Sequence, residues 1–442
     1  MTRSGGKPSR IGRVAAIGAL VSLGLVSASM ANAESDDWAM SEHPGGSFTV
    51  YSFGQSPYTR SASFLVLEDR QRVSDGSKAF REVPAGDPLD APATPATLVA
   101  PATPTMQATQ DHNAPSCEAC HVRNGRGLAH AALFSETGFS VPIQTQSSAA
   151  PVFRSPVTHG PAVSKLEGIT WRVKRTVFLS DGTKVELVAP LAIINGERSQ
   201  ADLRNAPGVY GLGLIEAISD RAIRELAQSR PYARLGIAGV LAVSETAEKV
   251  GRFGWKGRFS SLDAQVHSAI VNEIGIADRP AGSPGFDDLQ NALTSYMRWL
   301  AVPARRPSSG GEYRRGAQAF ARIGCSMCHQ PTWRTTNADD APPELRDQVI
   351  HPFTDLLLHD MGDGLRDCND NDLSRLWRTP ALWGIGMQPA VSDRAGFLHD
   401  GRARNLLEAV LWHGGEAATT MRRFETLSTH ERHDLLTFLS SL

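Results

Sequence analysis

The sequence predicts a mainly α-helical protein with two similar domains and a small β-hairpin insertion in the first of them. A short cysteine and histidine motif occurs twice, at 117–121 and 325–329, and each copy precedes a similar arginine-proline-glycine phrase. The segments 261–274, 286–300 and 312–323 carry apolar residues at helical spacing. A motif and a phrase that recur in the same order indicate an internal duplication.

The N-terminal segment predicts export. Four basic residues precede a short apolar stretch at 14–30, and Ala31-Asn32-Ala33 fits a small-x-small cleavage site. A membrane anchor is the alternative, but glycine and serine interrupt the stretch, and no later segment is long and apolar enough to span a bilayer. Cleavage after residue 33 would leave 41 basic and 46 acidic residues, a net charge of about −5, which disfavours nucleic acid as a partner.

The next segment, 34–110, is an N-terminal extension to which the sequence assigns no function. Its second part, from Pro84 to about Gln110, is rich in Pro, Ala and Thr and predicts an irregular loop. We divide the remaining chain into a first domain, 111–305, and a second domain, 306–442, because Pro303, Pro307 and a Ser-Ser-Gly-Gly run mark a boundary.

The two Cys-x-x-Cys-His motifs predict two covalently bound c-type haems. The two thiols suit the two vinyl groups on one porphyrin edge, and the adjacent imidazole is an axial iron ligand. The residues are Cys117, Cys120 and His121 in the first motif, and Cys325, Cys328 and His329 in the second. Zinc or a disulfide is the alternative. Haem attachment of this type occurs outside the bacterial cytoplasm, so the motifs agree with export and with a periplasmic protein.

Between the motifs, alternating residues at 169–188 with a Ser180-Asp181-Gly182 turn predict a β-hairpin. The repeated phrase is Arg-x-x-Pro-x-x-x-Gly-x-Gly from Arg204 and Arg-x-Pro-x-x-x-Gly-x-Gly from Arg378. It is not a dinucleotide-binding loop, because no strand precedes it and the third glycine is missing. After the first motif, arginines at 123–127 are either haem propionate partners or solvated loop residues. Near the C-terminus, Ser428 to Glu431 is a capping box that starts a last helix.

Several longer phrases carry a family resemblance. They are His351–Gly362, Trp377–Pro380, Leu398–Arg404, Leu411–Glu416 and, in the first half, Gly251–Lys256. With the two motifs they resemble the di-haem oxidoreductase, putative peroxidase family, also labelled thiol oxidoreductase, over roughly residues 110–442. The phrase order is distantly similar to bacterial di-haem cytochrome c peroxidases and the methylamine dehydrogenase maturation enzyme. This resemblance implies two all-α, cytochrome-c-like haem domains, one that transfers electrons and one that meets peroxide.

The resemblance also implies haem ligands. His413 stands where the peroxidases have the methionine that ligates their C-terminal haem, so we expect it to be the distal ligand of the second haem, with His351, His359 and Met361 as competitors. No histidine occurs at 197–203, where the peroxidases can cap their first haem, so the first iron is expected to have an open position.

The match to the calcium site of those peroxidases is incomplete. Asn205 matches their calcium-binding asparagine, but Arg394 replaces their threonine.

Glu216 is the candidate acid-base residue near the first haem. Cleaving a peroxide needs a group that moves a proton between its oxygens, and a carboxylate among apolar residues can do this. A structural glutamate at a helix start is the alternative. Trp383 and Trp412 are either electron relays or packing residues.

The sequence thus predicts a periplasmic, peroxidase-like di-haem c-type oxidoreductase. Electrons from a periplasmic donor protein would enter at the His329 haem and pass to the His121 haem, where hydrogen peroxide or another small oxidant would be reduced. One alternative is an electron-transfer cytochrome with no small substrate. Another is an enzyme that oxidises a residue on a partner protein.

Overall fold

The structure is a computed structural model. It describes residues 37–82, 116–127, 166–194, 197–199, 204–229, 231–244, 248–274, 276, 282–306, 311–339, 341–367, 373–393 and 395–442. The predicted export signal, the Pro-rich loop and Arg394 lie outside these residues.

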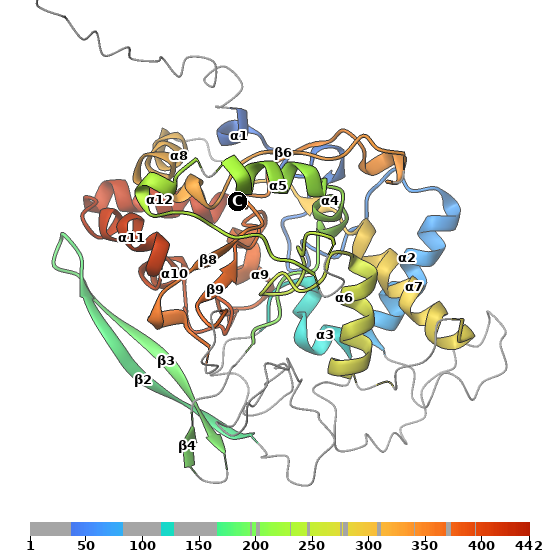
Figure 1. The fold of residues 1–442 in the computed structure, drawn as a ribbon, viewed down its shortest axis with the longest axis horizontal. Helices are drawn as coiled ribbons and strands as arrows, with labels where there is room; N and C mark the ends of the chain where they lie inside the picture. Colours follow the sequence, from blue (N-terminus) through green and yellow to red (C-terminus); the bar gives the residue numbers. More distant parts are fainter. Residues whose placement is uncertain are drawn as a thin grey trace, which may run out of the picture. The chain divides into compact units, whose positions relative to one another are not determined.

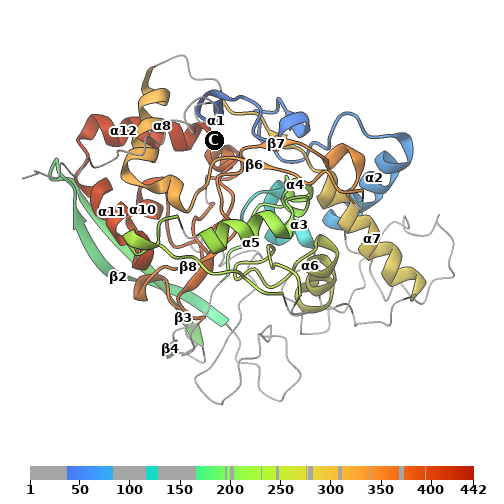
Figure 2. The same cartoon turned by 45° about the horizontal axis from the view of Figure 1, so that its top comes forward.

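Helices dominate the described part (Figures 1 and 2). The longer ones are α2 (Leu67–Arg81), α5 (Asp220–Ser229), α6 (Leu262–Ala269), α7 (Pro284–Trp299), α8 (Gly311–Ile323), α11 (Ala418–Glu425) and α12 (Thr429–Ser441). The shorter ones are α1 (Asp37–Met40), α3 (Cys117–Cys120), α4 (Leu212–Glu216), α9 (Gln388–Val391) and α10 (Leu406–Leu411). The helices predicted at 261–274, 286–300 and 312–323 are confirmed, and the capping box at the start of α12 is complete.

The strands are few. The longest pair, β2 (Leu166–Phe178) and β3 (Lys184–Ile194), is antiparallel and confirms the predicted hairpin; β4 (Glu197–Ser199) continues it. Gly182 in its turn has φ 82°, a conformation that favours glycine. The remaining strands are β1 (Thr49–Val50), β5 (Val302–Pro303), β6 (Trp333–Arg334), β7 (Val349–Ile350), β8 (Leu358–Asp360) and β9 (Leu376–Arg378).

The hairpin packs against the C-terminal helices, although it comes from the first half of the sequence. Val177 and Leu187 are buried in the same apolar cluster as residues of α8 and α12. At the turn, the Ser180 hydroxyl donates to the Leu427 carbonyl at 2.5 Å, and the Thr429 hydroxyl donates to Asp181 at 2.9 Å. The hairpin therefore joins the two halves of the chain.

A helix pair occurs once in each half. α2 packs on α7, and α8 packs on α12, at opposite sides of Figure 1. A glycine lies at each crossing: a Cβ on Gly76 would lie 2.0 Å from the Ala292 carbonyl, and one on Gly316 would lie 2.1 Å from the Asp434 carbonyl. Only glycine permits such close backbones. α2 and α8 each precede a Cys-x-x-Cys-His motif in the sequence, and α2 also contacts α3, which carries the cysteines of the first motif.

The repeated phrase also forms two equivalent loops. Gly211 and Gly384 have φ of 69° and 71° and lie just before α4 and a 3-10 turn at 385–387, respectively. The loops pack on each other: a Cβ on Gly211 would lie 2.6 Å from the Trp383 ring, and one on Gly384 would lie 2.6 Å from the Tyr210 hydroxyl. The repetition seen in the sequence is therefore present in three dimensions.

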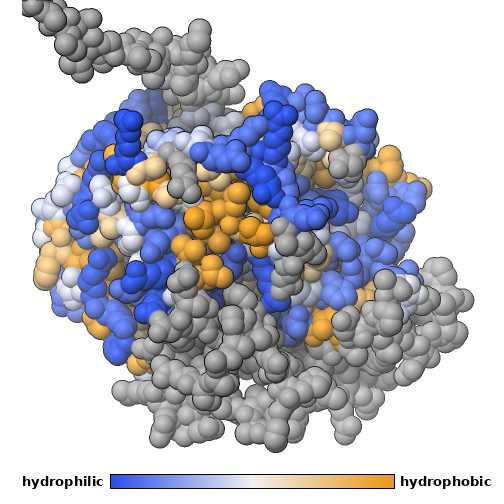
Figure 3. All heavy atoms as spheres, viewed as in Figure 1, coloured by the Kyte–Doolittle hydropathy of each residue, from blue (hydrophilic) through white to orange (hydrophobic). Residues whose placement is uncertain are grey.

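Some apolar residues are exposed on the surface of the described part of the chain. On the face drawn in Figure 3, apolar residues gather in one patch. In the loop after α5, Leu235, Val240 and Val243 are exposed apolar residues. Within the described residues, we find no helix long and apolar enough to cross a membrane.

Candidate functional site

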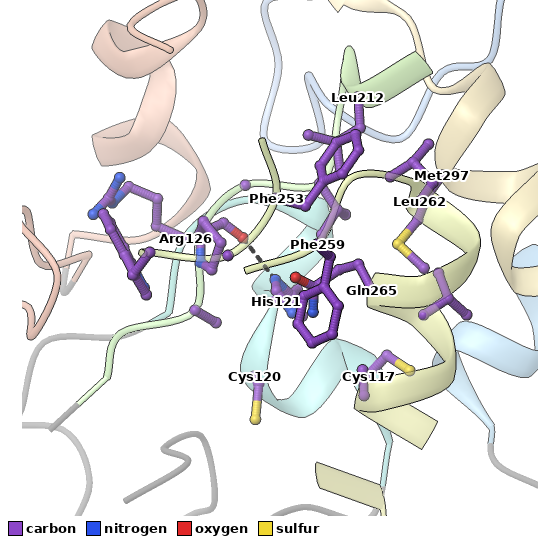
Figure 4. A pocket seen from close by; sticks show the side chains of 18 of the residues that line it. Cys117, Cys120, His121, Arg126, Leu212, Phe253, Phe259, Leu262, Gln265 and Met297 are labelled. Carbon is purple, nitrogen blue, oxygen red and sulfur yellow. Dashed lines mark hydrogen bonds between the residues drawn. The ribbon is translucent and has the colours of Figure 1, made fainter. Parts of the chain in front are cut away.

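The first motif lies in a cavity of about 380 Å³ (Figure 4). The Ser116 side chain accepts a hydrogen bond from the Ala119 amide at 3.3 Å and so starts the single turn of α3 that carries Cys117 and Cys120. His121 Nδ1 lies 2.6 Å from the Pro207 carbonyl of the repeated phrase. This hydrogen bond fixes the ring and leaves Nε2 available as a metal ligand. Burial lowers the pKa of His121, which favours the neutral, ligating form.

The second motif lies in a cavity of about 170 Å³ after α8. The His329 ring is oriented in the same way, with Nδ1 3.0 Å from the Phe353 carbonyl. Burial is the main reason why the pKa of His329 falls to about 3. In both motifs a backbone acceptor therefore orients the imidazole, and burial favours its neutral form.

His413 faces His329 in the second cavity. The two ring centres are 6.4 Å apart with an angle of 53° between the ring planes, and His413 Nδ1 is bonded to the Ala409 carbonyl at 2.8 Å. Two metal–imidazole bonds of about 2 Å on opposite sides of one ion would separate the ring centres by about 6 Å. The geometry therefore fits one metal ion between His329 and His413.

Two of the three competitors of His413, His359 and His351, fit this position less well. His359 has both ring nitrogens occupied, by Asp355 at 2.7 Å and Glu416 at 2.8 Å. Burial alone would lower the pKa of His359, but its bonds to Asp355, Cys328 and Glu416 raise it to about 12, so the ring is cationic and a poor ligand. His351 is not among the residues that line the cavity, whereas Met361 is.

The first cavity contains no such imidazole pair. Among the described residues that line it, His121 is the one histidine. Phe253, Phe259 and Leu262 form apolar walls around it (Figure 4). The Met297 thioether is also part of the lining. The two cavities therefore differ in the ligands that they offer.

Comparison with known proteins identifies a family for part of the chain. Residues 277–442 match the family described as "Di-haem oxidoreductase, putative peroxidase". The predicted resemblance is thereby confirmed over this segment, which contains the second motif and His413 but not the first motif.

No curated protein matches the chain. Among solved structures, a chain of hydrazine synthase from Kuenenia stuttgartiensis, pressurised with xenon, is 17% identical, with a TM-score of 0.31, over 55% of this chain and 73% of that chain. This likeness is too distant to carry a functional argument.

Glu216, the acid-base residue expected from the sequence, does not line the first cavity. Its carboxylate pairs with Arg298 at 2.9 Å and accepts the amide of Leu262, the first residue of α6, at 2.8 Å. These partners joining α4, α6 and α7 give Glu216 a structural position. Because these partners are distant in sequence, no local pattern reveals this position, and the acid-base role of Glu216 stays a prediction.

Two polar residues that sequence reasoning missed do line the cavity. Glu273 is the one Asp or Glu among its described lining residues, and the Gln265 Oε1 atom is buried without a hydrogen-bond partner. Both come from the segment of α6 and the π-helical turn Ile270–Ile274 that follows it. Such turns are frequent at functional sites. The signal available in the sequence was the presence of these two polar residues within the apolar helical segment predicted at 261–274.

Five residues line both cavities, so the cavities share a wall: Arg126, Trp255, Arg378, Pro380 and Ile385. Trp255 is the one aromatic residue among them, and its indole N–H donates to the Asn205 carbonyl at 2.8 Å. Trp383 lines only the first cavity and Trp412 lines neither. Asn205 Oδ1 is buried without a hydrogen-bond partner, but its side-chain amide donates to the Gly396 carbonyl at 2.8 Å.

Proposed function

We propose that this protein is a periplasmic di-haem c-type oxidoreductase of the peroxidase type. Electrons from a periplasmic donor protein would pass from the C-terminal haem to the N-terminal haem, where hydrogen peroxide is reduced by two electrons and two protons to two waters. The observation that carries the proposal is the difference between the cavities. One offers two facing imidazoles, and the other offers one imidazole together with an unpartnered amide oxygen and a carboxylate.

The residues present fit one haem in each cavity. Cys117 and Cys120, and Cys325 and Cys328, would hold the two porphyrins through thioether bonds. His121 would hold the first iron, and His329 and His413 would hold the second. When bound, the haems supply one-electron transfer and the redox chemistry of peroxide reduction.

At the first cavity, Glu273 would take a proton from one peroxide oxygen and return it to the other. Gln265 would orient the peroxide, because its side-chain oxygen is an acceptor with no protein partner. Phe253, Phe259 and Leu262 would exclude bulk water. Trp255 would lie between the two haem sites, since its side chain lines both cavities.

An electron-transfer cytochrome is the second candidate. Met297 supports it, because a thioether in the first cavity could be a sixth iron ligand there. Both irons would then be closed to small substrates.

Carbon monoxide binding tests the two candidates. The fully reduced protein is titrated with carbon monoxide and, separately, the protein in each redox state is mixed with hydrogen peroxide. A shifted band of one haem and rapid reaction with peroxide are expected. If no redox state binds carbon monoxide and Met297→Leu then does, Met297 is the ligand and the cytochrome function replaces the peroxidase function.

A further inference from the structure

Two buried arginines lie in the wall between the cavities. Arg126 and Arg378 each line both of them, and Arg126 is 8% exposed. In Figure 4, Arg126 lies on the side of His121 away from Gln265 and Leu262, toward C-terminal segments of the chain. The Arg126 guanidinium lies 5.3 Å from the centre of the Trp255 ring, which is the one aromatic side chain among the residues that line both cavities.

Their hydrogen-bond partners are neutral. Arg126 donates from Nε to the Gly396 carbonyl at 3.1 Å and from Nη2 to the Leu398 carbonyl at 2.7 Å. Arg378 donates from Nε to the Gly254 carbonyl at 2.9 Å and from Nη1 to the Thr379 carbonyl at 3.2 Å.

No carboxylate of the described residues lies within ion-pair distance of either guanidinium. Asp355 acts on Arg378 only from farther away. By contrast, the buried Arg402 pairs with Asp400 at 2.6 Å. Arg305 is also buried without an acid, but it lies over three aromatic rings and lines neither cavity.

Burying a guanidinium without an acidic partner destabilises the folded protein. We therefore expect a negatively charged ligand beside Arg126 and Arg378. Burial lowers the pKa of both guanidinium groups to about 10, and they therefore remain cationic at neutral pH. Each haem carries two carboxylates, for which guanidinium is a well-matched, bidentate partner.

We propose that Arg126 and Arg378 are shared counter-ions that bind carboxylates of both haems and raise the reduction potentials of both. The inference rests on the proposed presence of two haems and not on peroxide turnover. A fixed positive charge in a low-dielectric wall favours the reduced form of each iron. One side chain then acts on two redox centres at once.

The test is a spectroelectrochemical titration of the holoprotein. Arg126→Gln should lower both potentials, each by about a tenfold change in the ferric-to-ferrous ratio, or about 59 mV for a one-electron couple. Arg126→Lys should keep both reduction potentials close to those of the unsubstituted protein, because lysine retains the positive charge. Arg378→Gln should also lower both, and it provides a second reading if Arg126→Gln fails to fold.

Two control variants make the result specific. Arg258 lines only the first cavity, so Arg258→Gln should shift only the first haem. Arg322 is 58% exposed and pairs with Glu431, so Arg322→Gln should shift neither. Two haems per chain with a single potential shifted, or none, in both the Arg126→Gln and Arg378→Gln variants would overturn the inference. Fewer than two haems in the unsubstituted protein would instead defeat the proposed function.

Discussion

At the scale of single residues, substitution of Glu273 and of Glu216 distinguishes a catalytic glutamate from a structural one. Glu273→Gln should slow the reaction with hydrogen peroxide by roughly 10²–10⁴-fold, because glutamine cannot carry the proton. Stopped-flow mixing with peroxide measures the rate. Glu216→Gln is the matched control: its carboxylate pairs with Arg298 outside the cavity, so the rate should stay close to that of the parent protein. The reverse outcome would return the acid-base role to Glu216.

His413 allows a second prediction at this scale. His413→Met should retain both haems and raise the potential of the second one, since a thioether stabilises ferric iron less than imidazole does. A new near-infrared sulfur-to-iron band should accompany the shift. His351→Gln is the control, because His351 does not line the second cavity. An unchanged spectrum in His413→Met would point to Met361.

At the scale of elements, the crossing of α8 and α12 depends on one glycine. Gly316→Ala would place a Cβ 2.1 Å from the Asp434 carbonyl and force the helices apart. Overpacking of this kind costs roughly 1–3 kcal/mol of unfolding free energy. Thermal unfolding of the holoprotein measures it. Gly54→Ala is the control, since nothing lies within 4 Å of its Cβ position; an equal loss there would show a general intolerance of alanine.

The start of α12 gives a pH dependence. Hydrogen bonds from Ser428 and Arg322 lower the pKa of Glu431 from 4.5 to about 2. A carboxyl whose pKa is lowered by folding stabilises the fold above its unfolded pKa, and this contribution disappears as pH falls from about 4.5 to about 2. Glu431→Gln should therefore flatten the loss of melting temperature between pH 5 and pH 2. A curve parallel to that of the parent protein would contradict this role.

At the scale of the whole molecule, we expect two haems per chain. A pyridine haemochrome assay counts them, and acid-acetone extraction should release neither, because thioether bonds survive it. Extractable haem, or zinc in its place, would contradict the covalent attachment.

Local patterns made the repeated motifs, the hairpin and the α12 cap predictable, because each is specified by residues close in sequence. Glu273 was not found, since it lies in a π-helical turn, which presents residues that regular helical spacing does not. Gln265 lies in α6, and nothing in its local sequence pattern distinguishes it from a surface residue. The pairing of Glu216 with Arg298 and the packing of α2 on α7 join residues that are distant in sequence, so no local pattern reveals them.

The reciprocal loops at Gly211 and Gly384 make the two halves of the chain dependent on each other. Each loop uses the absence of a side chain to admit an aromatic ring or hydroxyl from the other, so neither half presents a finished surface by itself. A chain cut between the halves would expose Tyr210 on one fragment and Trp383 on the other. The two loops are therefore expected to fold together, and a larger residue at Gly211 would require a smaller one in place of Trp383.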